Sequence, residues 1–158
     1  GDLETAVAAL DELYASSIEG QGAALVRLSN AHQHALWTQD WELLGRLIAP
    51  DFEFADRRTL STIELDRAGY MARIEAVADE YTYAWWCRTL ERLTETDGVA
   101  RIQAYATTTD GQRLEWEFVG VTQMRDGQFT RFEYYDLDRM DDALARYEEL
   151  TASAQRES

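Results

Sequence analysis

The residue best suited to chemistry is Asp56, which closes the apolar run FEFAD at residues 52–56. Side chains alternate between the two faces of a β-strand, so the two phenylalanines and Asp56 share one face. If the phenylalanines point inward, a partly desolvated carboxylate lies beside them, and such a group suits proton transfer near neutral pH. The alternative is that the strand ends at Ala55 and that Asp56 pairs with Arg57 or Arg58 in a solvated turn.

The run at residues 99–109 has two contrasting faces. One face is polar and carries Arg101, Gln103 and Tyr105. The other is small and aliphatic and carries Ala100, Ile102, Ala104 and Ala106. A polar inner face would line a pocket, and a flat apolar outer face would then need cover, which predicts a homodimer through the sheet. The opposite assignment, with the alanines in the core, is left open by the pattern.

Further candidates lie on the two runs that follow. Glu133 is a possible second acid, and alternation places it on one face with Phe129, Arg131 and Tyr135. Residues of the preceding run could form an apolar wall on their common face: Leu114, Trp116, Phe118 and Gly120. Aromatic side chains in such a run are more often core than ligand contacts. Because Trp85 and Trp86 are adjacent in a predicted strand, one of the two indoles points inward, but alternation does not tell which one.

His32 falls on the apolar stripe of a predicted helix with Leu25, Leu28, Ala35 and Leu36. A histidine in that position is more often a core residue with one hydrogen-bond partner than a catalyst. His34, two residues on, is turned about 200° away, so the two imidazoles are not arranged to bind one metal ion. We therefore expect neither a metal nor a cofactor.

Composition excludes several classes of function. The 158 residues carry a net charge of −15, and all fifteen basic residues are arginine. Nucleic acids and anionic membranes need cationic patches, so neither is an expected partner. The single cysteine cannot form an internal disulfide. No apolar run approaches the ~18 residues of a membrane span. These features predict a cytoplasmic protein.

The predicted elements form an α+β domain. Helices are expected at residues 2–17 and 23–39, after Asp40, and after Asp66, where Tyr70, Ile74 and Val77 would point inward. The short strand 52–56 lies between the last two helices. Four strands follow at 81–94, 99–109, 113–124 and 128–136, separated by the hairpin signals Asp97-Gly98, Asp110-Gly111 and Asp126-Gly127. A closing helix would be capped by Asp138 or Asp141. Residues 1–20 read as an extra helix, whose apolar stripe of Leu3, Val7, Leu10 and Tyr14 would pack on the domain, and residues 21–158 read as the main domain.

From about His32 to Leu150 the chain resembles the nuclear transport factor 2-like superfamily, also called SnoaL-like. The resemblance rests on His32, on Trp37-Thr38-Gln39-Asp40-Trp41, on Ile48-Ala49-Pro50-Asp51-Phe52 and on Phe54-Ala55-Asp56. At the far end it rests on Gly120-Val121, Arg125-Asp126-Gly127 and Tyr134-Tyr135-Asp136-Leu137. It implies a cone-shaped, curved antiparallel sheet with helices packed on its concave face and one pocket inside.

The resemblance also implies roles for individual residues. Asp56 matches the general base of the ketosteroid isomerases of this superfamily, and His32 matches their oxyanion-binding tyrosine. Gly120 stands where those isomerases have a second acid. Compared with the epoxide hydrolases, Arg101 matches an arginine of the active site, and Gln103 and Glu133 replace two aspartates.

The function expected first is cofactor-free acid–base chemistry on an apolar, carbonyl-bearing small molecule, of the cyclase, isomerase or hydratase/hydrolase type. The expected catalytic residues are Asp56, Glu133, Arg101 and His32. The expected ligand contacts are Gln103, Trp116, Phe118, Tyr135, Phe54 and Tyr70. The second expectation is a non-catalytic ligand-sensing or dimerisation domain of a larger actinobacterial regulatory protein. A scaffold whose cavity is filled by side chains comes third.

Overall fold

A computed structural model describes residues 2–17 and 22–157 of the chain, except for the side chains of residues 2–4, 11, 14, 16, 17, 83–88 and 157. Helices and strands follow one another in the order α1 (Asp2–Ser17), α2 (Ala23–Thr38), α3 (Trp41–Leu47), β1 (Ile48–Arg58), β2 (Ser61–Asp66), α4 (Arg67–Glu80), β3 (Tyr81–Leu93), β4 (Asp97–Thr108), β5 (Arg113–Arg125), β6 (Gln128–Tyr135), a 3₁₀ turn (Leu137–Arg139) and α5 (Met140–Glu157). The α+β class is confirmed.

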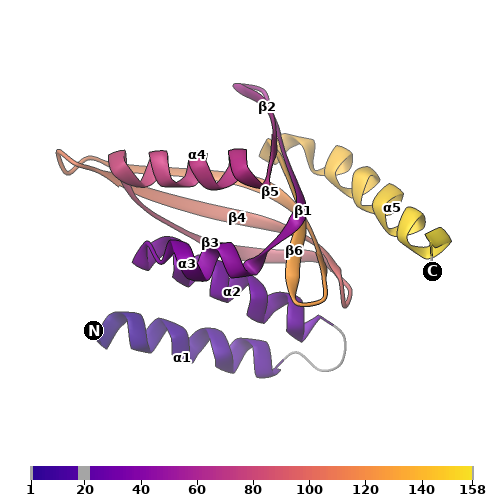
Figure 1. Cartoon of the computed structure of the whole chain (residues 1–158), viewed down its shortest axis with the longest axis horizontal. Helices are drawn as coiled ribbons and strands as arrows, with labels where there is room; N and C mark the ends of the chain where they lie inside the picture. The colour runs from indigo at the N-terminus through magenta and orange to yellow at the C-terminus, as the bar shows by residue number, and fades with distance from the viewer. Residues whose placement is uncertain (1, 18–21, 158) are drawn as a thin grey trace.

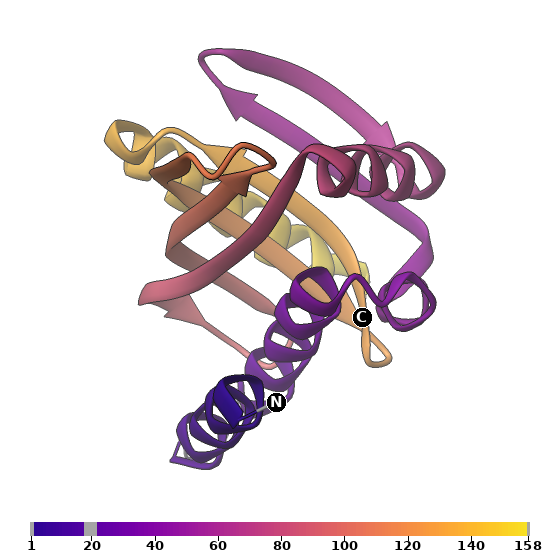
Figure 2. The same cartoon turned by 90° about the vertical axis from the view of Figure 1, so that its left-hand side faces the viewer.

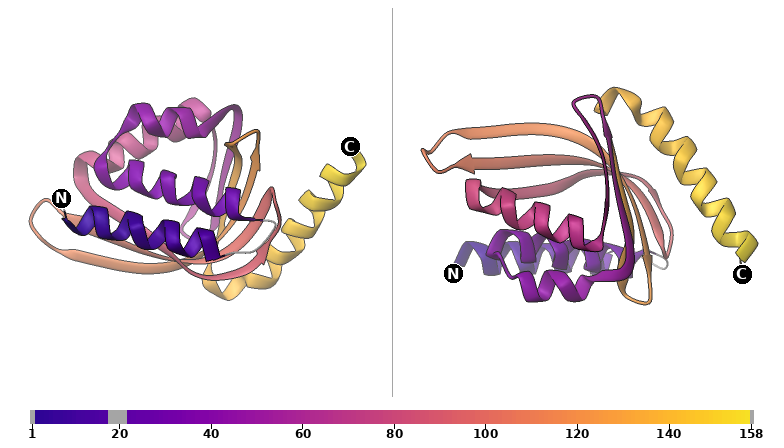
Figure 3. Two further views of the ribbon diagram at one scale, coloured as in Figure 1. Left: turned by 90° about the horizontal axis from the view of Figure 1, so that it is seen from below. Right: turned by 45° about the horizontal axis from the view of Figure 1, so that its top comes forward.

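The six strands form one strongly curved sheet in the order β2-β1-β6-β5-β4-β3. All neighbours are antiparallel except β1 and β6, which run parallel. Helices α2, α3 and α4 cover the inner face of the sheet, and α5 packs on the opposite, outer face (Figures 1 and 3). The cone-shaped sheet expected from the resemblance is therefore present, with one parallel pair and one helix outside the cone.

Strand β2 was not expected from the sequence. It pairs with the second half of β1, from Glu53 opposite Asp66 to Arg58 opposite Ser61. Its sequence STIELD alternates half-buried and exposed side chains, because β2 is an edge strand with one face toward the body. The pairing also extends β1 beyond the predicted end at Asp56, so that alternation continues to Arg58.

The predicted caps and turns are correct in part. Asp40 and Asp66 accept hydrogen bonds from the backbone N–H of Leu43 and Gly69, as expected for helix caps. Asp126 and Gly127 form a tight hairpin turn, with φ of 54° and 76°. Two consecutive positive φ angles are what a type I′ turn requires.

Two predicted boundaries are wrong. Asp97 and Gly98 lie inside β4, and the β3–β4 connection is at residues 94–96, where the N–H of Thr94 donates to the carbonyl of Asp97. The side chain of Asp97 is buried and accepts from Gln123 across the sheet, which explains why it belongs to the strand. Helix α5 continues directly from the 3₁₀ turn, so neither Asp138 nor Asp141 is its cap.

The main core fills the space between the inner face of the sheet and α2, α3 and α4. Its largest fully buried side chains include Phe52, Phe118, Phe129, Tyr70 and Leu44. A smaller cluster lies under α5 on the outer face and contains Val99, Val119, Val121, Tyr135 and Ala143. Figure 2 shows α5 behind the sheet and α4 in front of it.

The alanine-rich face of β4 points inward, so the expected homodimer through an apolar outer face loses its basis. Ala104 and Ala106 are fully buried, and they lie directly across from large side chains of β5, Trp116 and Leu114. Small residues next to large ones fill the core without overlap. Gly120 follows the same rule, since a Cβ there would lie 2.8 Å from Cδ1 of Ile102.

Helix α1 packs against α2, as expected for a segment that cannot bury an apolar stripe within itself. Ala15 is fully buried, and Glu12 forms an ion pair of 3.0 Å with Arg27 of α2. The predicted stripe is wrong at Leu10, which is 64% exposed. The side chains of Leu3 and Tyr14, the ends of that stripe, lie outside the described residues.

None of the described helices combines the length and the apolar character that crossing a membrane requires. Within the described residues, no group of three or more histidine, cysteine or acidic side chains is arranged to hold a metal ion.

Candidate functional site

Asp56 lies on the inner wall of the sheet and is tied to Arg58. Its side chain is fully buried, two residues beyond the core residue Phe54 and directly beside Tyr134 of β6. The guanidinium of Arg58 donates from Nη2 to Oδ2 (2.6 Å) and from Nε to Oδ1 (2.9 Å), and the Arg58 backbone N–H adds a third bond. The predicted inward orientation is therefore correct, and so is the arginine partner. The solvated turn is wrong.

Arg58 brings a positive charge to the same wall. Its guanidinium carbon lies 5.1 Å from the centre of the Phe118 ring and 5.5 Å from that of Tyr134. A cation over the face of an aromatic ring is attracted by the ring's electrons. The side chain as a whole remains 24% exposed. The Asp56–Arg58 pair is thus a polar group on the inner face of the sheet, which we call the inner wall and which is otherwise lined by the apolar and aromatic side chains of Phe54, Phe118 and Tyr134.

The wall continues along β5 toward the β4–β5 hairpin. Trp116 and Leu114 follow Phe118 at alternate positions on the same face. Alternate residues of a strand are about 6.6 Å apart, so Trp116 is the next side chain beyond the Phe118–Arg58 contact. Trp116 is half-buried and Leu114 is 41% exposed. An apolar surface therefore lies next to the Asp56–Arg58 pair.

His32 is a core residue that forms a hydrogen bond with Tyr70. Its Nε2 lies 2.8 Å from the hydroxyl oxygen of Tyr70, and its ring packs edge-on against Phe129 and Phe132. Burial lowers the pKa of His32 to about 3, because the charged imidazolium is poorly solvated there. At neutral pH the ring is uncharged. Tyr70, expected to contact ligand, is fully buried in the same cluster.

Glu133 lies on the outer face, so the expectation that it shares a pocket with Asp56 is wrong. In the parallel β1–β6 ladder Asp56 is opposite Tyr134, and Ala55 is opposite Glu133, which places the two acids on different faces. The predicted face of β6 was wrong at Phe129 as well. An irregularity of the β5–β6 ladder between Gln123 and Met124 moves Phe129 to the inner face, away from Arg131.

Three arginines surround the fully buried carboxylate of Glu133. Arg57 Nε and Arg146 Nε each lie 3.0 Å from one of its oxygens, and Arg131 Nη1 lies 3.4 Å away. Burial alone would raise the pKa of Glu133, but the hydrogen bonds from Arg57 and Arg146 and the nearby charges hold it below its ordinary value. The Tyr135 hydroxyl donates to the same carboxylate at 3.4 Å. Burial raises the pKa of the Tyr135 hydroxyl. We interpret this outer cluster as the polar anchor of α5.

Arg101 and Gln103 also point to the outer face, away from Asp56. Arg101 is exposed and pairs with Glu91 at 3.2 Å, and the Gln103 amide contacts the carbonyl of Trp116 at 3.4 Å. The residues that the resemblance matches to active-site positions are thus divided, since Arg101, Gln103 and Glu133 face outward and Asp56 faces inward. Of the expected ligand contacts, Phe54, Trp116 and Phe118 share that wall. The expected inward indole of Trp85 or Trp86 lies outside the described side chains.

The residue that sequence reasoning undervalued is Arg58. Its position two residues after Asp56 is the signal that could have found it, because the same alternation that turns Asp56 inward also turns Arg58 inward. Among the arginines around Glu133, Arg131 carried the same signal, two residues away on the same strand, but Arg57 and Arg146 carried none. Arg57 and Arg146 are far apart in the sequence and meet only because α5 folds back over the sheet.

We expect His32 to make stability depend on pH. Between its folded pKa of about 3 and the ordinary 6.5, the unfolded chain binds a proton that the folded chain does not. Stability should therefore fall as pH drops below 6.5, by about 2 kcal/mol at pH 5. Urea unfolding of the wild type and of His32→Gln at pH 7 and pH 5 measures this loss, which the variant should lack. His34→Gln is the matched control, and an equal loss in His32→Gln would contradict the assignment.

Removal of the Glu133 charge tests the contribution of this cluster to stability. Glu133→Gln leaves three partly exposed arginines without their carboxylate, and we expect a loss of about 2–3 kcal/mol at pH 7. Because the folded pKa of Glu133 is lowered, its contribution is complete above the ordinary pKa of 4.5 and disappears as pH falls through the folded value. The difference in unfolding free energy between wild type and Glu133→Gln should therefore shrink as the pH falls below 4.5. Glu115→Gln, at an exposed pair with Arg113, is the control; a pH-independent difference would argue against the cluster.

Comparison with known proteins identifies the fold. No family model and no curated protein sequence matches the chain. Solved structures do match. An LEH-like epoxide hydrolase of M. tuberculosis aligns with a TM-score of 0.63 at 12% identity, over 84% of this chain and 98% of that one. PrhC from Penicillium brasilianum aligns with a TM-score of 0.63 at 18% identity, over 82% and 91%.

A third similar structure is a Δ5-3-ketosteroid isomerase from Mycobacterium sp., with a TM-score of 0.60 at 15% identity over 71% of this chain and 92% of that one. At these identities the likeness concerns the fold, because this architecture hosts unrelated functions. The chain has the nuclear transport factor 2-like fold.

Proposed function

We propose that the inner wall of the sheet binds a small apolar molecule by one carbonyl group, with Arg58 as the hydrogen-bond donor. The observation that carries this proposal is the position of Arg58. The buried carboxylate of Asp56 binds one edge of the guanidinium, and the rings of Phe118 and Tyr134 pack against its face. The Arg58 side chain is nevertheless partly exposed to solvent. The neighbouring Trp116 and Leu114 offer apolar surface for the body of the ligand.

The chemistry of the pair favours a neutral acceptor. A guanidinium has five N–H donors in one plane, so an arginine that holds one carboxylate can hold a second acceptor. The Asp56–Arg58 pair is neutral as a unit, and the whole chain carries −15. A second anion would be repelled by that charge, whereas a carbonyl oxygen would not. Because Asp56 already fixes the guanidinium, the ligand does not bear the cost of ordering a long side chain.

This proposal can be tested with two bicyclic molecules that differ by one carbonyl, α-tetralone and tetralin. We expect α-tetralone to bind more tightly and to raise the melting temperature further. Arg58→Gln should weaken α-tetralone about ten-fold to a hundred-fold, the value of one charge-assisted hydrogen bond, and leave tetralin unchanged. Arg46→Gln, at an exposed pair with Glu42, is the control. Equal affinity for the two molecules, or no effect of Arg58→Gln, would contradict the proposal.

A second candidate is acid–base catalysis with Asp56 as the base, and the observation that favours it is the buried carboxylate on the same wall. The other expected catalytic residues give no support, since Glu133 and Arg101 face outward and His32 is held in the core. A base at Asp56 would remove the proton next to a bound carbonyl, while Arg58 stabilised the negative charge that develops on the oxygen.

Exchange of the α-protons of α-tetralone with D₂O, followed by proton NMR, separates the two candidates without a known substrate. A catalytic Asp56 should accelerate the exchange, and Asp56→Asn should lose about 10²- to 10⁴-fold of that rate at saturating α-tetralone. The variant should still bind α-tetralone, but less tightly, because Arg58 is no longer fixed. A circular-dichroism melt checks that the variant is folded, because it leaves Arg58 without its carboxylate. No acceleration by wild-type protein that is saturated with α-tetralone would exclude catalysis and leave the binding function.

A further inference from the structure

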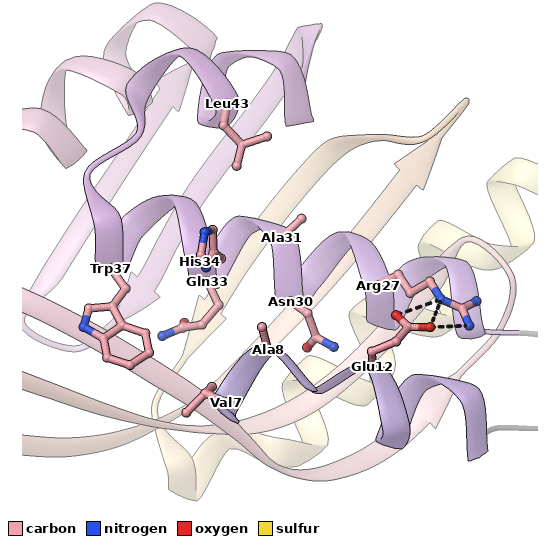
Figure 4. Close-up of a pocket in the computed structure, with 10 residues that line it drawn as sticks. All are labelled: Val7, Ala8, Glu12, Arg27, Asn30, Ala31, Gln33, His34, Trp37 and Leu43. Carbon is pink, nitrogen blue, oxygen red and sulfur yellow. Dashed lines mark hydrogen bonds and ion pairs between the residues drawn. The ribbon is translucent and has the colours of Figure 1, made fainter. Parts of the chain in front are cut away.

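A pocket lies on the side of α2 that faces α1, away from the inner wall of the sheet. Its volume is about 250 Å³, and α1 and α2 form most of its wall (Figure 4). Pockets for drug-sized ligands measure roughly 300–1,000 Å³, so this one suits a smaller molecule. The apolar part of the lining comes from Val7 and Ala8 of α1, Ala31 and Trp37 of α2, and Leu43 of α3. The polar part comes from Glu12 of α1 and from four residues of α2, namely Arg27, Asn30, Gln33 and His34.

Gln33 is the exceptional residue of this pocket. Its side chain is only 8% exposed, and neither Nε2 nor Oε1 has a hydrogen-bond partner among the residues that the structure describes. Figure 4 shows its amide pointing from α2 toward the space between Trp37 and Val7. A buried amide with unmade hydrogen bonds is costly to a folded protein, and most buried polar groups have partners. The position therefore calls for a group that supplies both an acceptor and a donor.

One end of the pocket is fixed by an ion pair. Arg27 of α2 and Glu12 of α1 meet at 3.0 Å, with both nitrogens Nε and Nη2 of the guanidinium engaged by the carboxylate. This bidentate contact holds α1 beside α2 where the apolar residues of α1 face Gln33. The extra N-terminal helix thus completes a cavity that α2 could not enclose with its own residues.

We propose that this pocket binds a small, flat, neutral amide or lactam. The amide edge would pair with Gln33, donating to Oε1 and accepting from Nε2, and the body of the molecule would lie against Trp37 and the aliphatic side chains of α1. Two parallel hydrogen bonds between amides match both polar atoms of Gln33 at once. The site is separate from the inner wall, because α2 lies between them (Figure 1).

Benzamide and toluene test the proposal, since they share the ring and differ in the amide. Binding is measured by NMR titration of the Trp37 indole N–H, assigned by its absence in Trp37→Phe. We expect benzamide to bind at least ten-fold more tightly than toluene. Gln33→Met should reduce benzamide to the level of toluene and leave the melting temperature equal or higher, because it removes the unpaired amide. Gln155→Met, exposed on α5, is the control.

Two results would overturn the proposal. Benzamide that binds no better than toluene would mean that the Gln33 amide is satisfied otherwise, for example by water. Unchanged benzamide binding in Gln33→Met would mean that the probe binds elsewhere. Arg58→Gln identifies that case, since it should not affect benzamide at the α1–α2 pocket but should weaken it at the inner wall. The outcome for this pocket is therefore independent of the outcome for the proposed function.

Discussion

The parallel pairing of β1 with β6 is the contact on which the arrangement of charged groups depends. It places Asp56 beside Tyr134 and Ala55 beside Glu133, so that the two buried carboxylates lie on neighbouring strands and point to opposite faces of the sheet. Alternation then turns Asp56 and Arg58 inward and Glu133 and Arg57 outward. A slip of one residue in this register would exchange the two faces and bury the wrong side chains.

Each buried carboxylate is compensated by arginine, but to a different degree. On the outer face Arg57, Arg131 and Arg146 surround Glu133, and the cluster holds α5 against the sheet. On the inner face Arg58 pairs with Asp56, and the aromatic rings of Phe118 and Tyr134 pack against the guanidinium. The outer cluster is saturated and structural. The inner pair is neutral, fixed and next to solvent, which is why we assign the binding function to that face.

Much of the fold could be predicted because it follows from local chemistry. The caps at Asp40 and Asp66 and the turn at Asp126-Gly127 depend on neighbouring residues alone, and the inward position of Asp56 follows from two phenylalanines in the same strand. Strand β2 could not be found in this way, since an edge strand with two aliphatic residues has a weak pattern. Alternation also cannot tell which face of β4 is inside. The size of the partners across the ladder decides it, with Ala104 beside Trp116.

The candidate site was less predictable than the fold, because it depends on contacts between distant segments. A ladder irregularity changed the face of Phe129, and the register of β1 against β6 separated Asp56 from Glu133. Gln33 carried no signal at all, since nothing in a helical pattern distinguishes a buried unpartnered amide from a solvated one. Only the packing of α1 against α2 reveals it.

A crystal structure of the protein with α-tetralone tests the central claim most directly. The account predicts that the carbonyl oxygen lies about 2.7–3.2 Å from a guanidinium nitrogen of Arg58, with the rings of the ligand over Trp116 and Leu114. The bidentate contact between Arg58 and Asp56 should remain in place. A ligand bound without contact to Arg58, or a ligand that breaks the Asp56–Arg58 pair, would contradict the account.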